Sequence, residues 1–275
     1  MTYSVLMSVY YKEDAKFFWE SIRSIYNQTI PTDDFVLVCD GPLGVELDKV
    51  ICDARSLFKE RIHIIRLKNN HGLGYALNIG LKKCKNELVA RMDSDDISMV
   101  DRCERQLSVF ENNPNIDIVS GYVQEFDRNP GDMKTVRIVP KTSEHIRDFS
   151  KKRNPFNHPC VMYKKSKVLN AGGYKQFYML EDYYLWVRML MDGAIGYNIQ
   201  DPILYMRVGN GMYKRRSGWK HAKSQVRLFK YMYDNGFITL IQYIKSAVFR
   251  TMASLVPNSF RKKIYNIFLR SKAAI

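Results

Sequence analysis

The stretch "ELVARMDSDD", residues 87–96, joins a strand-like apolar run to a cluster of acids. Its first half predicts a buried β-strand. Asp93, Asp95 and Asp96 then follow within four positions. Carboxylates this close repel one another when they are ionised. The folded protein must therefore compensate the charge of these carboxylates, either by local structure or by a bound ligand.

The residues before this stretch alternate regularly between strand-like and helix-like segments. Short apolar runs occupy residues 3–10, 34–40, 61–68 and 87–93. Between them, apolar residues recur at helical spacing, for example in residues 15–26. Such alternation predicts an α/β fold in which a Rossmann-like, mostly parallel central sheet is flanked by helices on both faces.

Three polar features fall where strands of this sheet are expected to end. Asp40 ends the second strand, the turn of residues 69–80 follows the third, and the acid cluster ends the fourth. Ligands of open parallel sheets gather at the carboxyl ends of the strands. We therefore expect these features to share one rim and to form a binding site.

Two interpretations of the acid cluster are open. Asp and Ser side chains commonly cap a helix N-terminus, where the macrodipole tolerates their charge. Alternatively, carboxylates hold Mn²⁺ or Mg²⁺, which also binds the oxygens of a diphosphate. The position at the end of a parallel strand favours the divalent cation.

Seven motifs in order along the chain resemble the family 2 inverting glycosyltransferases, which have the GT-A fold and use nucleotide sugars. They are "SVLMSVYYKED", "VLVCDG", "NNHGLGYALNIGL", "ARMDSDD", "NHPCVMYKKS", "GGY" and "LEDYYLW". The resemblance implies a glycosyltransferase domain over residues 1–210. Its nucleotide-binding half would be residues 1–96, and its acceptor-binding half residues 97–210.

The resemblance also implies roles for single residues in the nucleotide-binding half. Ser8 and Tyr10 would line the nucleobase pocket, and Asp40 would accept a hydrogen bond from the base imide of uracil. Asp93 would lie near the ribose and the metal, and Asp95 on the metal. The chain departs from the family at "CDGP", where many members have "DDGS", so only Asp40 carries over there. Without the motifs, Tyr10 would be read as a core aromatic and Asp40 as a turn residue.

A second acidic pair, Glu181 and Asp182, precedes an unusually apolar helix-like segment. Ordinary capping of a helix N-terminus would explain the pair. The resemblance implies instead that Asp182 is the catalytic base and that Glu181 orients the acceptor. His158 would face the metal or the acceptor, or would simply be a structural histidine held by the following proline.

Positive charge is concentrated at the C-terminal end. Residues 201–275 contain fifteen Lys and Arg against two acids, out of a net charge of +15 for the whole chain. The pattern predicts a basic amphipathic helical tail over residues 211–275. Such a tail suits an anionic membrane surface, a nucleic acid or plain solvent, and we favour the membrane. Arg215 and Arg216 are expected to bind a phosphate of the acceptor or of the donor.

The remaining composition points to a cytoplasmic protein. Five scattered cysteines without a CxxC motif suggest neither disulfides nor zinc, and the first residues make a poor signal peptide. We therefore expect a peripheral enzyme on the inner face of the cytoplasmic membrane, without a nucleic-acid partner. The oligomeric state is left open.

The predicted activity is metal-dependent, inverting transfer of galactose or glucose from a UDP-sugar to a lipid-diphosphate-linked sugar, in the synthesis of surface polysaccharide or O-antigen. The alternatives are a sugar nucleotidyltransferase and a nucleic-acid-binding protein that uses the basic aromatic tail. The first lacks a Gly-rich loop after the first strand, and the second leaves the acids without a purpose.

Overall fold

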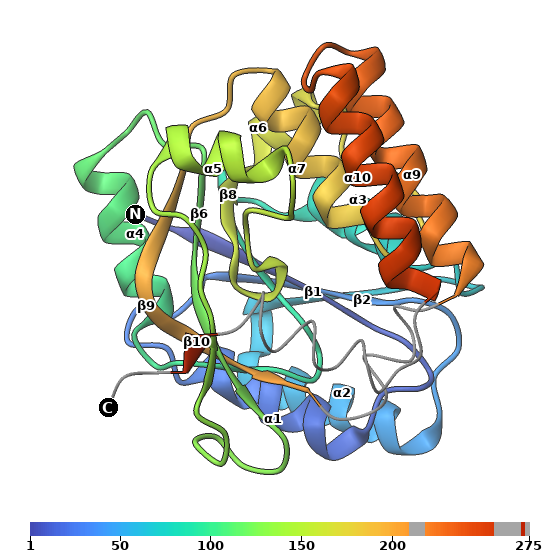
Figure 1. Ribbon diagram of the computed structural model, residues 1–275. Helices are drawn as coiled ribbons and strands as arrows, with labels where there is room; N and C mark the ends of the chain where they lie inside the picture. Colours follow the sequence, from blue (N-terminus) through green and yellow to red (C-terminus); the bar gives the residue numbers. More distant parts are fainter. Residues whose placement is uncertain (209–217, 256–270, 273–275) are drawn as a thin grey trace.

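The computed structural model describes residues 1–208, 218–255 and 271–272 (Figure 1). The strands are β1 Tyr3–Val9, β2 Asp34–Cys39, β3 Ile62–Arg66, β4 Leu88–Met92, β5 Ile97–Ser98, β6 Ile118–Phe126, β7 Thr135–Arg137, β8 Met162–Lys164, β9 Gly196–Arg207 and β10 Ser271–Lys272. The helices are α1 Ala15–Tyr26, α2 Val45–Phe58, α3 Leu73–Lys83, α4 Arg102–Asn112, α5 Ser143–Ser150, α6 Lys165–Asn170, α7 Glu181–Met191, α9 Trp219–Asp234 and α10 Leu240–Leu255, with short 3-10 turns at Lys59–Arg61 and His158–Cys160.

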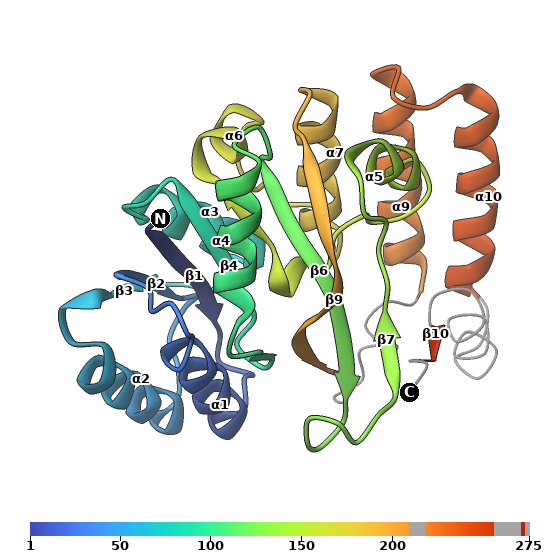
Figure 2. The same cartoon turned by 90° about the vertical axis from the view of Figure 1, so that its left-hand side faces the viewer.

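The strands form one mixed sheet in the order β10-β7-β6-β8-β4-β1-β2-β3, with β9 paired to β6 and β5. β3, β2, β1 and β4 are parallel, which confirms the expected Rossmann-like half. β8 runs antiparallel to both β4 and β6, and β9 runs parallel to β6. Figure 2 shows β6, β9 and β7 side by side in this later half.

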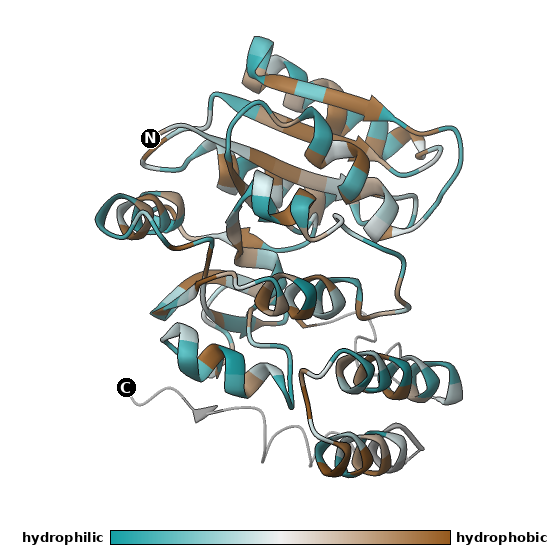
Figure 3. Cartoon of the chain, turned by 90° about the horizontal axis from the view of Figure 1, so that it is seen from above, coloured by the Kyte–Doolittle hydropathy of each residue, from teal (hydrophilic) through white to brown (hydrophobic). Residues whose placement is uncertain are grey.

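Alternating side chains of the strands build a hydrophobic core on each face of the sheet. On one face, Val5 and Met7 of β1 pack with Phe18 of α1, Ile51 of α2 and Leu107 of α4. Figure 3 shows hydrophobic residues, in brown, along the strands and on the helices. α1, α2 and α4 therefore cover this face of the sheet.

The second core lies on the other face, under α3, α6, α7 and α9. It contains Val89 of β4, Leu77 of α3, Trp186 of α7 and Phe229 of α9, all fully buried. α9 is thus packed against the same core as α7 and is not an isolated appendage. The expected boundary near residue 210 stays a prediction, because residues 209–217 lie outside the described part of the chain.

A glycine sets the distance between α3 and the sheet. A Cβ at Gly80 would lie 2.5 Å from Leu6 Cδ1 and 2.7 Å from Val38 Cγ2. Real Cβ atoms do not approach other atoms this closely, so only glycine allows α3 to rest on β1 and β2. Gly80 therefore sets how closely α3 packs on the parallel half of the sheet.

The C-terminal helices differ in how deeply they are buried. α9 buries Leu228, Phe229 and Met232, whereas α10 exposes a row of large apolar side chains. Among the described residues, no helix combines the length and the apolarity that crossing a bilayer requires.

Candidate active site

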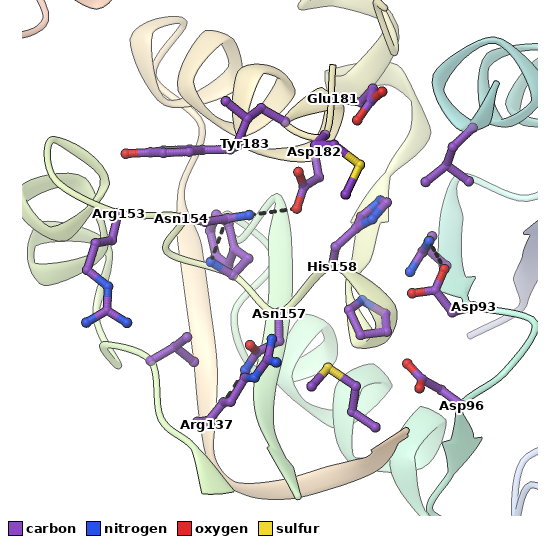
Figure 4. Close-up of a pocket in the computed structure, with 18 of the residues that line it drawn as sticks. Asp93, Asp96, Arg137, Arg153, Asn154, Asn157, His158, Glu181, Asp182 and Tyr183 are labelled. Atoms are coloured by element: carbon purple, nitrogen blue, oxygen red, sulfur yellow. Dashed lines mark hydrogen bonds and ion pairs between the residues drawn. The ribbon is translucent and has the colours of Figure 1, made fainter. Parts of the chain in front are cut away.

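A cleft of about 380 Å³ opens between the carboxyl end of β4 and the N-terminus of α7. Asp93, Asp95 and Asp96 lie on its β4 side, and Glu181 and Asp182 come from α7. Figure 4 shows Asp93 and Asp96 on one side of the cleft, with Asp182 across from them. The two acidic groups predicted from sequence therefore face the same cavity.

The acid cluster does not cap a helix. The next helix, α4, begins only at Arg102, and its N-cap residue is Asp101. Asp93, Asp95 and Asp96 instead offer carboxylate oxygens that all lie within 4.8 Å of one another. This geometry rules out the capping interpretation and leaves the cation interpretation in place.

Burial makes the crowded charge costly. It raises the pKa of Asp95 to about 7, with the charge of Asp93 as the next cause. It raises the pKa of Asp96 well above its usual range, with the charge of Asp95 adding to the effect. A bound divalent cation would remove this cost, and three carboxylates are the hard oxygen ligands that Mn²⁺ and Mg²⁺ prefer. The residues present therefore fit such an ion.

Two arginines that we did not predict hold the cluster in place. Arg91 forms an ion pair with Asp93. Arg207 of β9 donates from its backbone nitrogen to Asp96 at 2.8 Å and from Nε to the Asp95 carbonyl at 3.0 Å, and its Nη2 lies 2.7 Å from Glu20. The sequence signal for Arg91 was an arginine inside the otherwise apolar strand β4. Arg207 is the last residue of the mixed strand β9 and gave no comparable signal.

On the opposite wall, Asp182 lies at the first turn of α7. Asn154, from the loop before β8, donates a hydrogen bond to Asp182 Oδ2 at 2.6 Å (Figure 4). The helix N-cap is Leu180, without a side-chain cap. Asn154 carried no recognisable signal in the sequence, because its loop has no regular pattern.

Glu181 is in a different environment from Asp182. Burial raises the pKa of Glu181 to about 7, and the charge of Asp182 adds to the rise. A Cβ at Gly74, in the first turn of α3, would lie 3.2 Å from Glu181 Cγ. The side chain of Glu181, from the first turn of α7, therefore packs against the first turn of α3 at the edge of the cleft.

His158 lines the cleft and is almost fully buried. Its Nε2 lies 3.2 Å from the Tyr174 hydroxyl, and its ring packs edge-on against Trp186. Burial lowers the pKa of His158 well below its usual value, and the nearby charge of Arg91 lowers it further. His158 is therefore neutral at pH 7 and can act as a hydrogen-bonding group, not as a cation.

The predicted nucleotide-side residues lie at the carboxyl ends of β1 and β2. Ser8 and Tyr10 are half-buried there. Asp40 is 2% exposed, and its two carboxylate oxygens accept hydrogen bonds of 2.8 Å from the backbone nitrogens of His71 and Gly72. Asp40 thus orders the turn before α3, and its contact with a base stays a prediction. The predicted phosphate ligands Arg215 and Arg216 lie outside the described residues.

The chain is similar to known proteins along most of its length. The family model described as "Glycosyl transferase family 2" matches residues 4–172. The chain is 38% identical to the UDP-Gal:alpha-D-GlcNAc-diphosphoundecaprenol beta-1,3-galactosyltransferase of Escherichia coli, over 98% of this chain and 96% of that protein. It is 36% identical to the amylovoran biosynthesis glycosyltransferase AmsE of Erwinia amylovora, over 96% of this chain and 97% of that protein.

The fold resembles that of a solved glycosyltransferase with little sequence identity. The mannosyltransferase PcManGT from Pyrobaculum calidifontis, in complex with GDP-Man and Mn²⁺, matches with a TM-score of 0.67 and 16% identity, over 97% of this chain and 80% of that one. The protein belongs to glycosyl transferase family 2 and has the GT-A fold. The predicted family and enzyme class are confirmed, and a sugar nucleotidyltransferase is no longer a candidate.

Proposed function

We propose that this glycosyltransferase moves a hexose, galactose or glucose, from a UDP-sugar to a sugar on a lipid diphosphate, with inversion at the anomeric carbon. The observation that carries the proposal is the placement of Asp182 across one cleft from the acid cluster of β4. The relative from Escherichia coli supports the UDP-sugar donor and the lipid-diphosphate acceptor by its name. The two relatives together suggest a role in building surface polysaccharide.

Asp182 is the proposed general base. It would take the proton of an acceptor hydroxyl while that oxygen forms a bond to the anomeric carbon of the donor. The bond from the anomeric carbon to the diphosphate breaks at the same time, and UDP leaves with the electron pair. The hydrogen bond from Asn154 holds the carboxylate at the wall of the cleft, where an acceptor hydroxyl would approach it. Attack from the face opposite the diphosphate gives a β product from an α-linked donor.

Asp93, Asp95 and Asp96 are the proposed ligands of a Mn²⁺ or Mg²⁺ ion. When bound, such an ion supplies positive charge to the departing diphosphate. The pair of Arg91 with Asp93 and the bonds of Arg207 fix the ligands beforehand, which preserves the geometry during the reaction. Glu181 and neutral His158 would orient the two sugars by hydrogen bonds.

A membrane surface is the proposed location of the reaction, because the acceptor carries a lipid. α10 exposes Leu240, Ile241, Ile244, Val248 and Phe249, each at least half exposed, at spacings that place them along one side of the helix. Arg250 projects from the opposite side of the same helix and lines the cleft. Docking of the apolar row of α10 into the headgroup region would therefore place the cleft one helix diameter, roughly 10 Å, from the membrane surface.

A donor panel tests this function. Purified protein is incubated with Mn²⁺, a synthetic GlcNAc-diphosphate-lipid and a set of UDP-sugars, and the product linkage is determined by NMR. We expect a β-linked hexose from UDP-galactose or UDP-glucose. Failure of every panel member to give a product would refute the proposal.

A further inference from the structure

Arg91 lies inside the sheet at the floor of the cleft. It belongs to β4, two residues before the first acid of the cluster, and its side chain is 1% exposed. Strand alternation places that side chain on the same face as Val89, towards α3 and α7. Arg91 also lines the cleft. It is therefore a buried cation at the wall of the proposed active site.

Among the residues that the structure describes, one nitrogen of this guanidinium group has a partner. Nη2 forms the ion pair with Asp93, whereas Nε and Nη1 have no hydrogen-bond partner in that part of the chain. A buried donor without an acceptor costs roughly 1–3 kcal/mol. The protein tolerates this cost beside the cleft, which Arg91 lines. Both nitrogens are buried, so the side chain has to turn towards the cleft before a substrate oxygen can accept a hydrogen bond from them.

The other fully buried arginine provides a contrast. Arg102 of α4 donates from Nε to Gln106, from Nη1 to the Pro159 carbonyl, and from Nη2 to the carbonyls of Arg91 and Val161. Every nitrogen of Arg102 is thus satisfied within the protein. Its role is to join β4 to the segment before β8, and it does not line the cleft.

The surroundings of Arg91 indicate which part of a donor it meets. Burial raises the pKa of the Tyr174 hydroxyl, which the charge of Arg91 opposes and the charges of Asp182 and Asp93 reinforce. Arg91, Asp93 and Asp182 also line one cleft, with Asp93 and Asp182 on its opposite sides (Figure 4). Because the diphosphate is held at the acid cluster and the acceptor at Asp182, the space between them receives the transferred sugar.

We propose that Nε and Nη1 of Arg91 donate hydrogen bonds to hydroxyl oxygens of the transferred hexose, which makes Arg91 a residue that determines donor specificity. The inference rests on the proposed function, since it requires a nucleotide sugar in this cleft. A site that is built to hydrogen-bond a hydroxyl rejects an analogue without it, because the buried donors are then left unpaired.

Calorimetry with UDP and with a UDP-hexose, both in Mn²⁺, tests the proposal. Arg91→Lys keeps the charge beside Asp93 but loses the planar fork. We expect it to weaken UDP-hexose binding at least about tenfold more than UDP binding, which also falls because Arg91 pairs with Asp93. Arg102→Lys is the matched control, and it should lower the Tm while leaving the ratio of the two affinities unchanged. An unchanged ratio in Arg91→Lys, or an equal loss of both ligands, would overturn the inference.

Monodeoxy donors provide a test in the wild-type protein, so the inference stays testable if Arg91→Lys does not fold. At least one monodeoxy UDP-hexose should bind about tenfold or more weakly than the parent donor. If each of them binds within about threefold of the parent donor, Arg91 does not hydrogen-bond to a hydroxyl of the sugar. If the wild type binds UDP but no UDP-hexose, or neither, the proposed function fails and this inference fails with it.

Discussion

Asn154 and Asp182 come from segments 28 residues apart and are joined by a hydrogen bond of 2.6 Å from Asn154 Nδ2 to Asp182 Oδ2. The bond fixes the carboxylate of the proposed base relative to the cleft. A carboxylate has further lone pairs that an acceptor hydroxyl can use. The relationship makes Asn154 a partner that positions the proposed base.

Removal of this partner should slow the reaction more than it weakens binding. We expect Asn154→Ala to lower kcat by about ten- to hundredfold with a small change in the acceptor KM, because the base is no longer held in place. Asp182→Asn should abolish turnover. Asn112→Ala, at an exposed position of α4, is the control and should behave as wild type. Steady-state kinetics checks all three, and full activity of Asp182→Asn would contradict the assignment.

Glu181 should make stability depend on pH. Its pKa is about 7 in the folded protein against 4.5 as the ordinary value, so a bound proton favours the folded state. This contribution is complete below pH 4.5 and is lost as the pH rises through about 7. Glu181→Gln does not titrate, so it should become more stable than wild type with rising pH, by on the order of 1–3 kcal/mol at pH 8.

Urea unfolding between pH 5 and pH 8.5 measures this difference. Glu144→Gln, near the start of α5 and exposed, is the control and should show no such trend. A Glu181→Gln effect that is the same at every pH would mean that the carboxyl is not perturbed by burial.

α9 should behave as part of the domain core. Phe229 is fully buried and its ring lies edge-on to Tyr183, with 6.4 Å between ring centres. Phe229→Ala should reduce the free energy of unfolding by about 3–5 kcal/mol. Phe249→Ala, at a 58% exposed position of α10, should change it by less than about 0.5 kcal/mol. Equal effects of the two variants in chemical denaturation would show that α9 does not pack as described.

The exposed row of α10 should govern membrane binding. We expect Ile244→Glu to reduce binding to phosphatidylglycerol-containing vesicles by about tenfold, because one buried isoleucine side chain contributes roughly 1.5–3 kcal/mol. Val45→Glu replaces an even more exposed residue, on α2, and should have no effect. Vesicle sedimentation measures membrane binding of the two variants and of the wild type. Unchanged binding of Ile244→Glu, or a dimer of the wild type that this variant dissociates, would refute a membrane role.

The sequence predicted the parallel half of the fold well because local patterns determine it. The apolar runs of β1, β2 and β4 alternate with helices, and the rim that carries Ser8, Asp40 and Asp93 follows from that order. The motif "LEDYYLW" likewise located the start of α7 at Glu181. The motifs mark positions where the chemistry requires one residue type.

The partners of these residues could not be predicted in the same way. Asn154 reaches Asp182, and Arg207 reaches Asp96, only after the chain has folded. Such contacts join segments distant in sequence and leave no periodicity. The deep burial of Asp40 and its bonds to the turn before α3 were also missed, because "CDGP" alone does not show which groups its carboxylate meets.

Asp93, Asp95 and Asp96 are proposed to hold a divalent cation that binds the diphosphate of the donor. The most direct measurement is calorimetry of UDP with the wild type in Mn²⁺ and in EDTA, repeated with Asp95→Asn and with the exposed control Asp53→Asn. We predict that EDTA and Asp95→Asn each weaken UDP binding by about tenfold or more, and that Asp53→Asn does not. Equal affinity for UDP in Mn²⁺ and in EDTA would contradict the account.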